Sequence, residues 1–399
     1  MDYDAVIIGA GACGLMCAVQ AGFRGKRVLI IERNDRPGAK ILISGGGRCN
    51  YTNIHTSPAN FISADPDFSK SIFAQWSAND TIQFFANKGI FGHEKTLGQL
   101  FPVSNSARDI VEVFTALLQQ QRQQIWLNSE VISIQKLINT GFFEIKIKQQ
   151  DAIEKIIQAR VVVVACGGLP VAKLGASDFG IRIARQFHLD ITQTAPALVP
   201  LTITGKESAW FAALSGNSIN ARVYNDQISF LENILFTHWG LSGPAILQIS
   251  SYWRPGQLIY IDLLPGDSIE NHINAERKEG GRRLLRQLLL TFYSKKFVDA
   301  LSKFLPVEKK IASLSKAEAK SAHDILHRFQ VKPAGDKGYD KAEVMRGGVA
   351  THELDPISLE SRKVPGLYFG GECVDVTGWL GGFNFQWAWA SGFAISQAI

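Results

Sequence analysis

The sequence predicts an α/β protein in which a doubly wound parallel sheet is interrupted by an inserted domain with a β-rich and a helical part. Three observations predict this fold. Short apolar runs rich in β-branched residues, typical of buried parallel strands, occur at residues 4–8, 27–31 and 159–166. Between the first two, residues 12–25 carry apolar side chains at helical spacing. From residue 191 short strands with prolines and glycines follow, and the strand, turn and helix pattern returns only near the C-terminus.

These patterns divide the chain into two domains. The α/β domain takes residues 1–190 and 346–399, and it includes two alternating strands at 130–137 and 142–149. The inserted domain takes residues 191–345. Its β-rich part spans 191–266 and its basic helical part spans 267–345. A chain of 399 residues is long enough for two or three domains.

The composition indicates a globular protein of the reduced cytoplasm. Hydrophobic residues make up 46% and charged residues 20% of the chain. The longest apolar runs fall short of the ~18 residues of a membrane-spanning helix. Met1 is followed by acidic Asp2 and Asp4, so no signal peptide is expected. The five cysteines show neither a C-x-x-C motif nor the spacing of a secreted disulfide framework.

The net charge of +6 is unevenly distributed. Residues 276–337 contain 15 Lys and Arg against 7 Asp and Glu, a balance of +8, which leaves −2 for the rest of the chain. Two interpretations remain open. The run is either a solvated helix face or a surface that attracts a phosphate-bearing partner, NADPH or RNA.

The strongest local motif is GAGACG at residues 9–14, which matches G-x-G-x-x-G. It follows a predicted strand, opens a predicted helix, and precedes Glu32, which lies 21 residues after Gly11. Gly9 permits the tight turn, Gly11 leaves room for a pyrophosphate at the helix N-terminus, and Gly14 lets the helix pack on the sheet. Glu32 is placed to accept hydrogen bonds from ribose hydroxyls. The motif predicts a dinucleotide-binding site.

The C-terminal block favours FAD over NAD as this dinucleotide. Gly370, Gly371 and Glu372 follow a predicted strand, and residues 381–384 begin the last predicted helix. A helix N-terminus directed at the flavin would stabilise the negative charge of its reduced form. The alternative for Glu372 and Asp375 is an ordinary turn at a strand end. The predicted fold is therefore a doubly wound, Rossmann-like FAD-binding domain with an inserted β-rich plus helical domain.

A second glycine-rich segment reads KILISGGGRCNYTN, at residues 40–53. Its three consecutive glycines lie between Lys40 and Arg48. Glycine allows backbone N–H groups to approach a ligand, and the flanking cations indicate that this ligand is anionic. A flexible loop with surface charges is the alternative.

The sequence resembles the BaiN/RdsA-type NAD(P)/FAD-dependent oxidoreductases, a family that includes proteins described as aminoacetone oxidases and bile-acid-type enone reductases. The resemblance spans nearly the whole chain. It rests on the stretches DYDAVIIGAGACGL, ERNDRPGAKILISGGGRCNYTN, VVVACGG, PALVPL, FTHWGLSGPAIL and the run from GGV to the C-terminus. Two positions depart from the family pattern: Cys166 stands where threonine is usual, and Phe383 where tyrosine is usual. Neither departure removes a charge.

The resemblance implies that residues 40–53 pass along FAD, with Lys40 near the phosphates and Arg48 and Asn50 near the flavin or its ribityl chain. NADH or NADPH is expected as a transient co-substrate, with reoxidation by dioxygen as the alternative. The predicted cofactor-binding residues are Gly9, Gly11, Ala12, Cys13, Gly14, Glu32, Arg33, Lys40, Ser44, Gly45, Gly46, Arg48, Asn50, Val131, Ala165, Gly371, Glu372, Asp375, Gly382, Phe383 and Asn384.

His238 is the candidate catalytic residue, because it precedes a Gly/Ser/Pro turn where a ligand could approach. Its imidazole could exchange the proton that accompanies hydride transfer. A hydrogen-bonded histidine in a domain interface is the alternative. Cys49 beside Arg48 is either a redox sensor with a lowered pKa or a small packing residue. No spacing indicates a metal site.

Together these features predict a cytoplasmic FAD-dependent oxidoreductase. Hydride would pass between the flavin and a small organic substrate in a cleft between the two domains. The enzyme would be reduced by NAD(P)H or, as an amine-type oxidase, reoxidised by dioxygen. The sequence contains no second G-x-G-x-x-G motif, so a nicotinamide cofactor has no Rossmann motif of its own. An RNA-modifying flavoenzyme and a flavin-based redox sensor are the alternatives. A small-molecule substrate is favoured over nucleic acid, and no membrane is expected.

Overall fold

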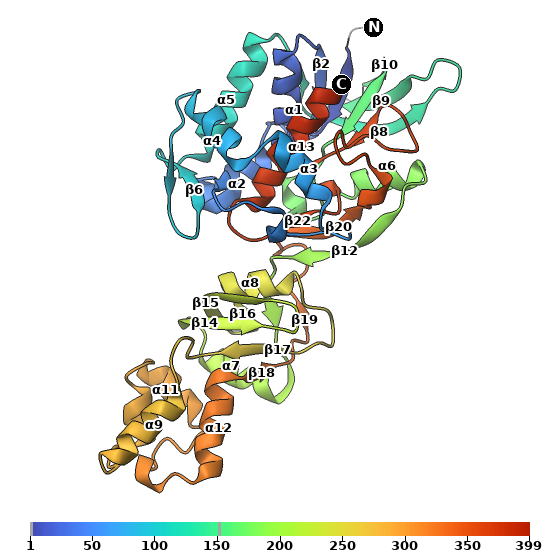
Figure 1. Cartoon of the computed structure of the whole chain (residues 1–399). Helices are drawn as coiled ribbons and strands as arrows, with labels where there is room; N and C mark the ends of the chain where they lie inside the picture. Colours follow the sequence, from blue (N-terminus) through green and yellow to red (C-terminus); the bar gives the residue numbers. More distant parts are fainter. Residues whose placement is uncertain (1–2, 151–152) are drawn as a thin grey trace. The chain divides into compact units, whose positions relative to one another are not determined.

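The computed structural model describes residues 3–150 and 153–399. They form two compact units (Figure 1). The first unit combines the described residues up to Ala195 with Val344–Ile399, and the second is Pro196–Glu343. The sequence analysis places these boundaries after residues 190 and 345.

A five-stranded parallel sheet forms the centre of the first unit. Its strand order is β21-β11-β1-β2-β7. The strands are β1 Ala5–Ile8, β2 Val28–Ile31, β7 Gln124–Trp126, β11 Val161–Val164 and β21 Leu367–Phe369. Each of the first two consists of four buried apolar residues, as expected for strands covered on both faces. β21 pairs in parallel with β11, so the C-terminal segment completes a sheet that begins at residue 5. The predicted Rossmann-like α/β fold is confirmed.

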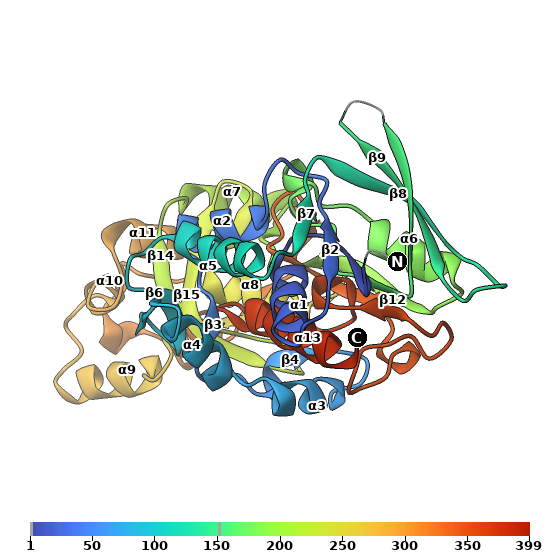
Figure 2. The same ribbon diagram turned by 90° about the horizontal axis from the view of Figure 1, so that it is seen from above.

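Helix α1 (Ala12–Phe23) packs along α13 (Phe383–Ala398), although the two lie at opposite ends of the chain (Figures 1 and 2). Gly392 allows this close approach, because a Cβ there would lie 2.4 Å from the Cys13 carbonyl oxygen. The Trp389 ring of α13 stacks on Phe114 of α5 (Ala107–Gln120). The other helices of the first unit are α2 Ala39–Gly47, α3 Phe68–Gln75, α4 Ala78–Ala86 and α6 Phe179–Gln186.

An antiparallel sheet in the order β10-β9-β8 extends the first unit (Figure 2). Its strands are β8 Ser129–Lys136, β9 Phe143–Gln149 and β10 Glu154–Ala159. The single strand predicted at 159–166 is divided, because Ala159 ends β10 and Val161 begins β11. Alternate residues such as Ile145 and Ile147 are buried and join the hydrophobic core of the unit.

Three small sheets and several short 3-10 helices complete the first unit. The sheets are β3 Thr52–Asn53 with β5 Gly92–Glu94 and β6 Gln99–Pro102, β4 Phe61–Ile62 with β22 Thr377–Gly378, and β12 Ile191–Ala197 with β20 Val344–Val349. The 3-10 helices are η1 Pro58–Asn60, η2 Ala172–Leu174, η5 Thr351–Glu353 and η6 Gly371–Cys373. None of the helices in the described part of the chain is both long and apolar enough to cross a membrane.

A seven-stranded antiparallel sheet forms the centre of the second unit. Its order is β18-β17-β14-β15-β16-β13-β19. The strands are β13 Leu201–Thr202, β14 Ser218–Tyr224, β15 Ser229–Thr237, β16 Gly240–Ser242, β17 Ile259–Asp262, β18 Phe329–Val331 and β19 Gly335–Asp336. The short helices η3 Gly205–Glu207, α7 Ser208–Ala213 and α8 Pro244–Ser250 accompany the sheet.

The helical part of the second unit contains α9 Ile269–Lys278, α10 Leu285–Leu289, α11 Lys295–Leu301, η4 Ile311–Ser313 and α12 Lys316–His327. The leucine-rich run after Gly281 forms two short helices. The Ser294 hydroxyl begins the second of them by accepting a hydrogen bond from the Phe297 N–H. β18 and β19 return to the sheet, although the sequence analysis assigns residues up to 345 to the helical part.

Candidate functional site

The turn between β1 and α1 has the geometry that its glycines require. Gly9 has φ +104°, and a Cβ there would lie 2.6 Å from the Ala165 carbonyl oxygen. A Cβ on Gly14 would lie 2.0 Å from the Gly9 carbonyl oxygen. The nearest atom to a Cβ on Gly11 is 4.0 Å away, so Gly11 borders open space. Ala12 begins α1, and its first N–H groups are not capped by a side chain. This helix N-terminus fits an anionic group.

Glu32 lies at the end of β2, where the backbone holds both of its carboxylate oxygens. Oε2 accepts a 2.7 Å hydrogen bond from the Ala10 N–H, and Oε1 accepts a 2.9 Å hydrogen bond from the Asn34 N–H. The side chain is buried next to the glycine turn. A carboxylate has further lone pairs, so Glu32 can still accept bonds from ribose hydroxyls. Arg33, the next residue, is exposed and donates to the Gly175 carbonyl.

The glycine-rich segment lies in α2 and breaks that helix near its C-terminal end. Ser44 is extended, Gly45 and Gly46 are left-handed, and the Cys49 φ is also positive, at +59°. Arg48 folds back, and its Nε donates to the Gly45 carbonyl at 2.9 Å. The segment therefore forms the kinked end of α2, with left-handed glycines before Arg48.

Lys40 and Glu372 face each other across the first unit. The Lys40 Nζ lies 2.7 Å from Glu372 Oε2, and Glu372 Oε1 accepts a hydrogen bond from the Met345 N–H at 3.0 Å. A Cβ on Gly168 would lie 3.1 Å from the Glu372 carboxylate. The structure thus brings together a cation, an acid and a glycine from three distant segments.

The N-terminus of α13 is the second helix end near these residues, and it also lacks a side-chain cap. Gly382 has φ +99°, and a Cβ there would lie 2.4 Å from the Thr52 carbonyl oxygen and 2.8 Å from Asn50 Oδ1. Asn384 holds the preceding turn, because its amide bonds both the N–H and the carbonyl of Gly378. Phe383 is buried. Asn50 Oδ1 is buried and has no hydrogen-bond partner among the described residues, so it fits a site that a donor-bearing ligand completes.

Three other predicted residues lie in the backbone framework of the first unit. Val131 is buried in β8 beside an irregularity of the ladder, and the Ala165 N–H donates to the Ile8 carbonyl after β11. The buried Asp375 accepts from the Ala64 N–H at 3.2 Å. Burial raises the pKa of Asp375, against the lowering effect of hydrogen bonds from Thr192, Ala64 and Gly347.

The family of this protein follows from its sequence as a whole. The family model described as "HI0933-like protein Rossmann domain" matches residues 3–398. The chain belongs to the HI0933-like family. This assignment confirms the predicted resemblance and identifies the chain as a member of a family of FAD-dependent oxidoreductases.

Three relatives of this chain align with it over almost their whole length. Ribosomal RNA dihydrouridine synthase of Escherichia coli (strain K12) is 42% identical over 100% of this chain and 98% of the relative. A protein of the same name from Haemophilus influenzae (strain ATCC 51907 / DSM 11121 / KW20 / Rd) is 40% identical over 99% of this chain and 98% of the relative. The 3-dehydro-bile acid delta(4,6)-reductase of Clostridium scindens (strain ATCC 35704 / DSM 5676 / VPI 13733 / 19) is 28% identical over 98% of both chains.

Solved structures share the HI0933-like fold at low sequence identity. A flavocytochrome c3 fumarate reductase matches with a TM-score of 0.52 and 14% identity, over 99% of this chain and 77% of that one. The 3-ketosteroid delta1-dehydrogenase from Sterolibacterium denitrificans matches with a TM-score of 0.52 and 13% identity over 100% of both chains. At these identities the likeness shows the fold alone.

The cysteines of this HI0933-like chain are not activated thiols. Cys49 is fully buried, and burial raises its pKa to about 12, although a hydrogen bond with Ser44 acts in the opposite direction. The hypothesis of a sensor cysteine with a lowered pKa is therefore wrong. Cys13 and Cys17 are also buried, and burial raises both of their pKa values.

His238 lies in the second unit, at the exposed turn between β15 and β16. The helix after the Gly/Ser/Pro turn is α8, which begins at Pro244 behind Gly243 with φ +89°. The His238 ring neighbours Trp239, with ring centroids 6.1 Å apart. Its exposure leaves the imidazole accessible to a ligand, and its role as a proton donor stays a prediction.

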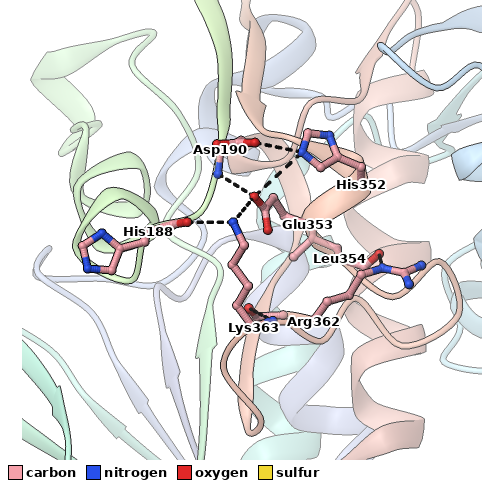
Figure 3. Close-up of polar contacts among 8 residues, drawn as sticks. His188, Asp190, His352, Glu353, Leu354, Arg362 and Lys363 are labelled. Atoms are coloured by element: carbon pink, nitrogen blue, oxygen red, sulfur yellow. Dashed lines mark hydrogen bonds and ion pairs between the residues drawn. The ribbon is translucent and has the colours of Figure 1, made fainter.

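No sequence motif marks a polar cluster that the fold forms from Asp190, His352 and Glu353 (Figure 3). His352 Nε2 lies 3.1 Å from Asp190 Oδ2, and the buried Glu353 accepts from the Asp190 N–H at 3.0 Å. Three potential metal ligands thus lie within 4.8 Å of one another. However, the Lys363 ammonium lies 2.6 Å from Glu353 Oε1 and also donates to the His188 carbonyl. This cation makes the cluster an ion-pair network. Its members are up to 175 residues apart, so no local motif predicts it.

The second unit contains a cavity of about 300 Å³ between α7, α12 and β18. Trp210, Phe211, Phe304 and Phe329 form its apolar walls. Its polar lining residues are Glu207, Asp324, Arg328 and Gln330. None of the predicted site residues of this HI0933-like chain lines it.

Proposed function

We propose that this chain reduces uridine in ribosomal RNA to dihydrouridine, with FAD as its redox group. The observation that carries the proposal is the 42% identity to a ribosomal RNA dihydrouridine synthase over the full length of the chain. This similarity includes the second unit, from which the substrate-contacting side chains are expected to come. The sequence analysis ranks a small organic substrate first and RNA second, and the proposal reverses that order.

The residues of the first unit fit FAD. The glycine turn and the uncapped start of α1 would hold the pyrophosphate, and Glu32 would hold the ribose. Lys40 would neutralise phosphate charge. The unpartnered Asn50 Oδ1 would accept a hydrogen bond from the flavin, beside the uncapped N-terminus of α13. FAD, when bound and reduced, supplies the hydride.

Uridine can be reduced by a flavin because its uracil ring is a conjugated carbonyl compound. The C5–C6 double bond of uracil is conjugated to the C4 carbonyl, so hydride adds at C6 and a proton adds at C5. The name of the Clostridium scindens relative describes the reduction of double bonds in a 3-dehydro bile acid, where the delta(4,6) bonds are conjugated to a ketone. Both substrates are therefore conjugated carbonyl compounds, and both need the same exchange of one hydride and one proton.

The protein's part in this reaction is to orient the base and to move the proton. We assign the proton transfer to His238, because its imidazole is exposed and a ligand can approach it. Each uridine reduced consumes one hydride and one proton, so the enzyme requires a two-electron donor. NADH or NADPH fills this role in the proposal, and it would dock without a Rossmann domain of its own.

The test uses the purified yellow protein, unmodified ribosomal RNA transcribed in vitro, and NADH or NADPH under anaerobic conditions. Nuclease digestion and mass spectrometry then measure dihydrouridine. We expect dihydrouridine only when enzyme and nucleotide are both present. Flavin that is reduced by NAD(P)H and reoxidised by a conjugated enone, but never by RNA, would overturn the proposal in favour of a small-molecule reductase.

The role of His238 is tested separately with the His238→Gln variant. We expect full FAD content and normal reduction by NAD(P)H, with flavin reoxidation by RNA slowed by about 100-fold, as for loss of a general acid. His272→Gln on α9 is the matched control and should behave as wild type. Loss of FAD or of folding in His238→Gln would indicate a structural histidine instead.

A further inference from the structure

The helical part of the second unit carries a basic tip, which we define as residues 276–284 and 308–318. These two segments contain 7 Lys and Arg against 4 Asp and Glu. The tip combines the end of α9, the loop before α10, η4 and the start of α12. It accounts for part of the positive charge that the sequence analysis left unexplained.

Backbone contacts hold the two segments of the basic tip together. The Ala312 N–H donates to the Gly281 carbonyl at 3.0 Å, and the Ile311 N–H donates to the Arg283 carbonyl at 2.9 Å. Gly281 has φ +58°, and a Cβ there would lie 2.7 Å from the Ala312 nitrogen. The Arg277 guanidinium ties α9 to η4 by donating to the Ile311 and Leu314 carbonyls. These contacts fix the backbone positions of the cations in the two segments of the tip relative to one another.

Most of the acids in the basic tip are already paired. Glu276 pairs with Arg283, Glu318 with Lys309, and Glu308 with Arg286 of α10. Four exposed cations remain, and within the described residues none of them takes part in an ion pair: Lys278, Arg282, Lys310 and Lys316. Glu308 and Glu279 are the exposed acids of the tip, and Glu279 takes part in no ion pair within the described residues.

The surface chemistry of the basic tip indicates which kind of partner it fits. None of its large hydrophobic side chains is exposed, whereas the protein-binding cores of interfaces are apolar. Spaced, fully hydrated cations without acid partners suit a polyanion, because they release counterions from phosphates on binding. Lysine and arginine contacts to a phosphate backbone need no base-specific geometry.

We propose that the basic tip binds the phosphate backbone of the RNA substrate. This inference rests on the proposed function, since it concerns how the substrate of that reaction is held. The tip would raise the affinity of the protein for RNA and would take no part in hydride or proton transfer. The four unpaired cations contribute affinity for any RNA of sufficient length, and the base at the catalytic site determines which residue is reduced.

The test compares RNA binding by the FAD-loaded wild type with that of a quadruple variant, Lys278→Gln, Arg282→Gln, Lys310→Gln and Lys316→Gln. The probe is in vitro transcribed bacterial ribosomal RNA, and the dissociation constant is measured across a series of salt concentrations. The control removes the same charge from exposed cations of the first unit by Lys70→Gln, Lys88→Gln, Lys148→Gln and Arg108→Gln. The FAD content and melting temperature establish that both variants are folded.

We expect the tip variant to bind RNA at least about tenfold more weakly than wild type. Because four phosphate contacts are lost, the slope of log K against log salt should be smaller in magnitude by about 3. Its flavin reduction by NAD(P)H should equal that of wild type. Equal affinity of wild type and tip variant, an equal loss in the control, or binding to anionic lipid vesicles in place of RNA would overturn the inference. If wild type binds RNA through the tip but forms no dihydrouridine, the proposed function fails and the binding surface stands.

Discussion

The Lys40 ammonium lies 2.7 Å from the Glu372 carboxylate, although 332 residues separate them in the chain. The pair joins α2 to η6, where the N-terminal and C-terminal segments of the first unit meet. Lys40 is 40% and Glu372 18% exposed, so both side chains remain accessible to a ligand that passes between these elements.

We expect Lys40→Gln to weaken FAD binding by about tenfold or more, because a charged group that bonds a phosphate contributes roughly 1.5–3 kcal/mol. The measurement is FAD release from the purified protein, followed by flavin fluorescence. Lys70→Gln on α3 removes an exposed charge elsewhere and should leave FAD bound. Unchanged FAD affinity in Lys40→Gln would assign the pair a purely structural role.

Substitutions at Gly11 and Gly14 are expected to have different effects: one weakens FAD binding and the other weakens folding. A Cβ at Gly11 meets no atom closer than 4.0 Å, so Gly11→Ala should leave the melting temperature of the apoprotein unchanged. It should nevertheless weaken FAD binding by about tenfold or more, because the methyl group would occupy space next to the pyrophosphate.

Gly14→Ala is the contrasting variant. Its Cβ would lie 2.0 Å from the Gly9 carbonyl, so α1 must move and the apoprotein should lose about 1–3 kcal/mol of stability. Thermal unfolding of both variant apoproteins measures their stability, and titration with FAD measures their FAD affinity. A Gly11→Ala protein with wild-type FAD affinity would mean that no ligand passes over this turn.

The four buried cysteines, Cys13, Cys17, Cys49 and Cys373, should be unreactive in the folded protein. Burial raises the pKa of Cys13 and of Cys49 to about 12 from an ordinary 9.0, which lowers the thiolate fraction about 1,000-fold near neutral pH. We expect a disulfide reagent such as DTNB to label the four buried thiols only after unfolding in guanidinium. Half-buried Cys166 is the thiol that should react in the folded state. Rapid labelling of Cys49, identified by comparison with Cys49→Ser, would contradict the structure.

Glu318 should make stability depend on pH in the acid range. Its hydrogen bonds from Lys309, and then from the Ser315 backbone, lower its pKa to about 2 from an ordinary 4.5. A carboxylate with a depressed pKa stabilises the folded state above its ordinary pKa, and this contribution disappears as pH falls from about 4.5 toward 2.

The Glu318→Gln variant therefore should melt below wild type at pH 7, and the difference should shrink between about pH 4.5 and pH 2. Melting temperatures across this range, with Glu279→Gln as a control for an exposed acid, measure the effect. A difference that is constant with pH would mean that the carboxylate charge does not matter at the start of α12.

Local patterns predicted the parts of the fold that depend on neighbouring residues. Strands β1 and β2, helix α1 and the start of α13 were predicted close to their observed bounds, because apolar periodicity and glycine turns act over a few residues. The residues 159–166 were predicted as one strand. They form two, because Ala159 pairs with Phe143 in one sheet while Val161 pairs with Ala5 in another.

In the candidate site, too, local features were predicted from the sequence and contacts between distant segments were not. The sequence identified Glu32 and the glycines around it through a short motif whose spacing carries the chemistry. It did not predict the Lys363–Glu353 ion pair or the cluster around it, because these contacts join segments far apart in the chain.

By itself the sequence determined the α/β class, the dinucleotide turn and the family, since each resides in local motifs or in the order of residues along the chain. The tertiary structure decided the state of the ionisable groups. For Cys49 beside Arg48 the sequence left an activated thiol and a packing residue open, and burial in the fold raises its pKa. Likewise only the fold joins residues 276–284 to 308–318, because a surface charge pattern depends on which distant segments pack together.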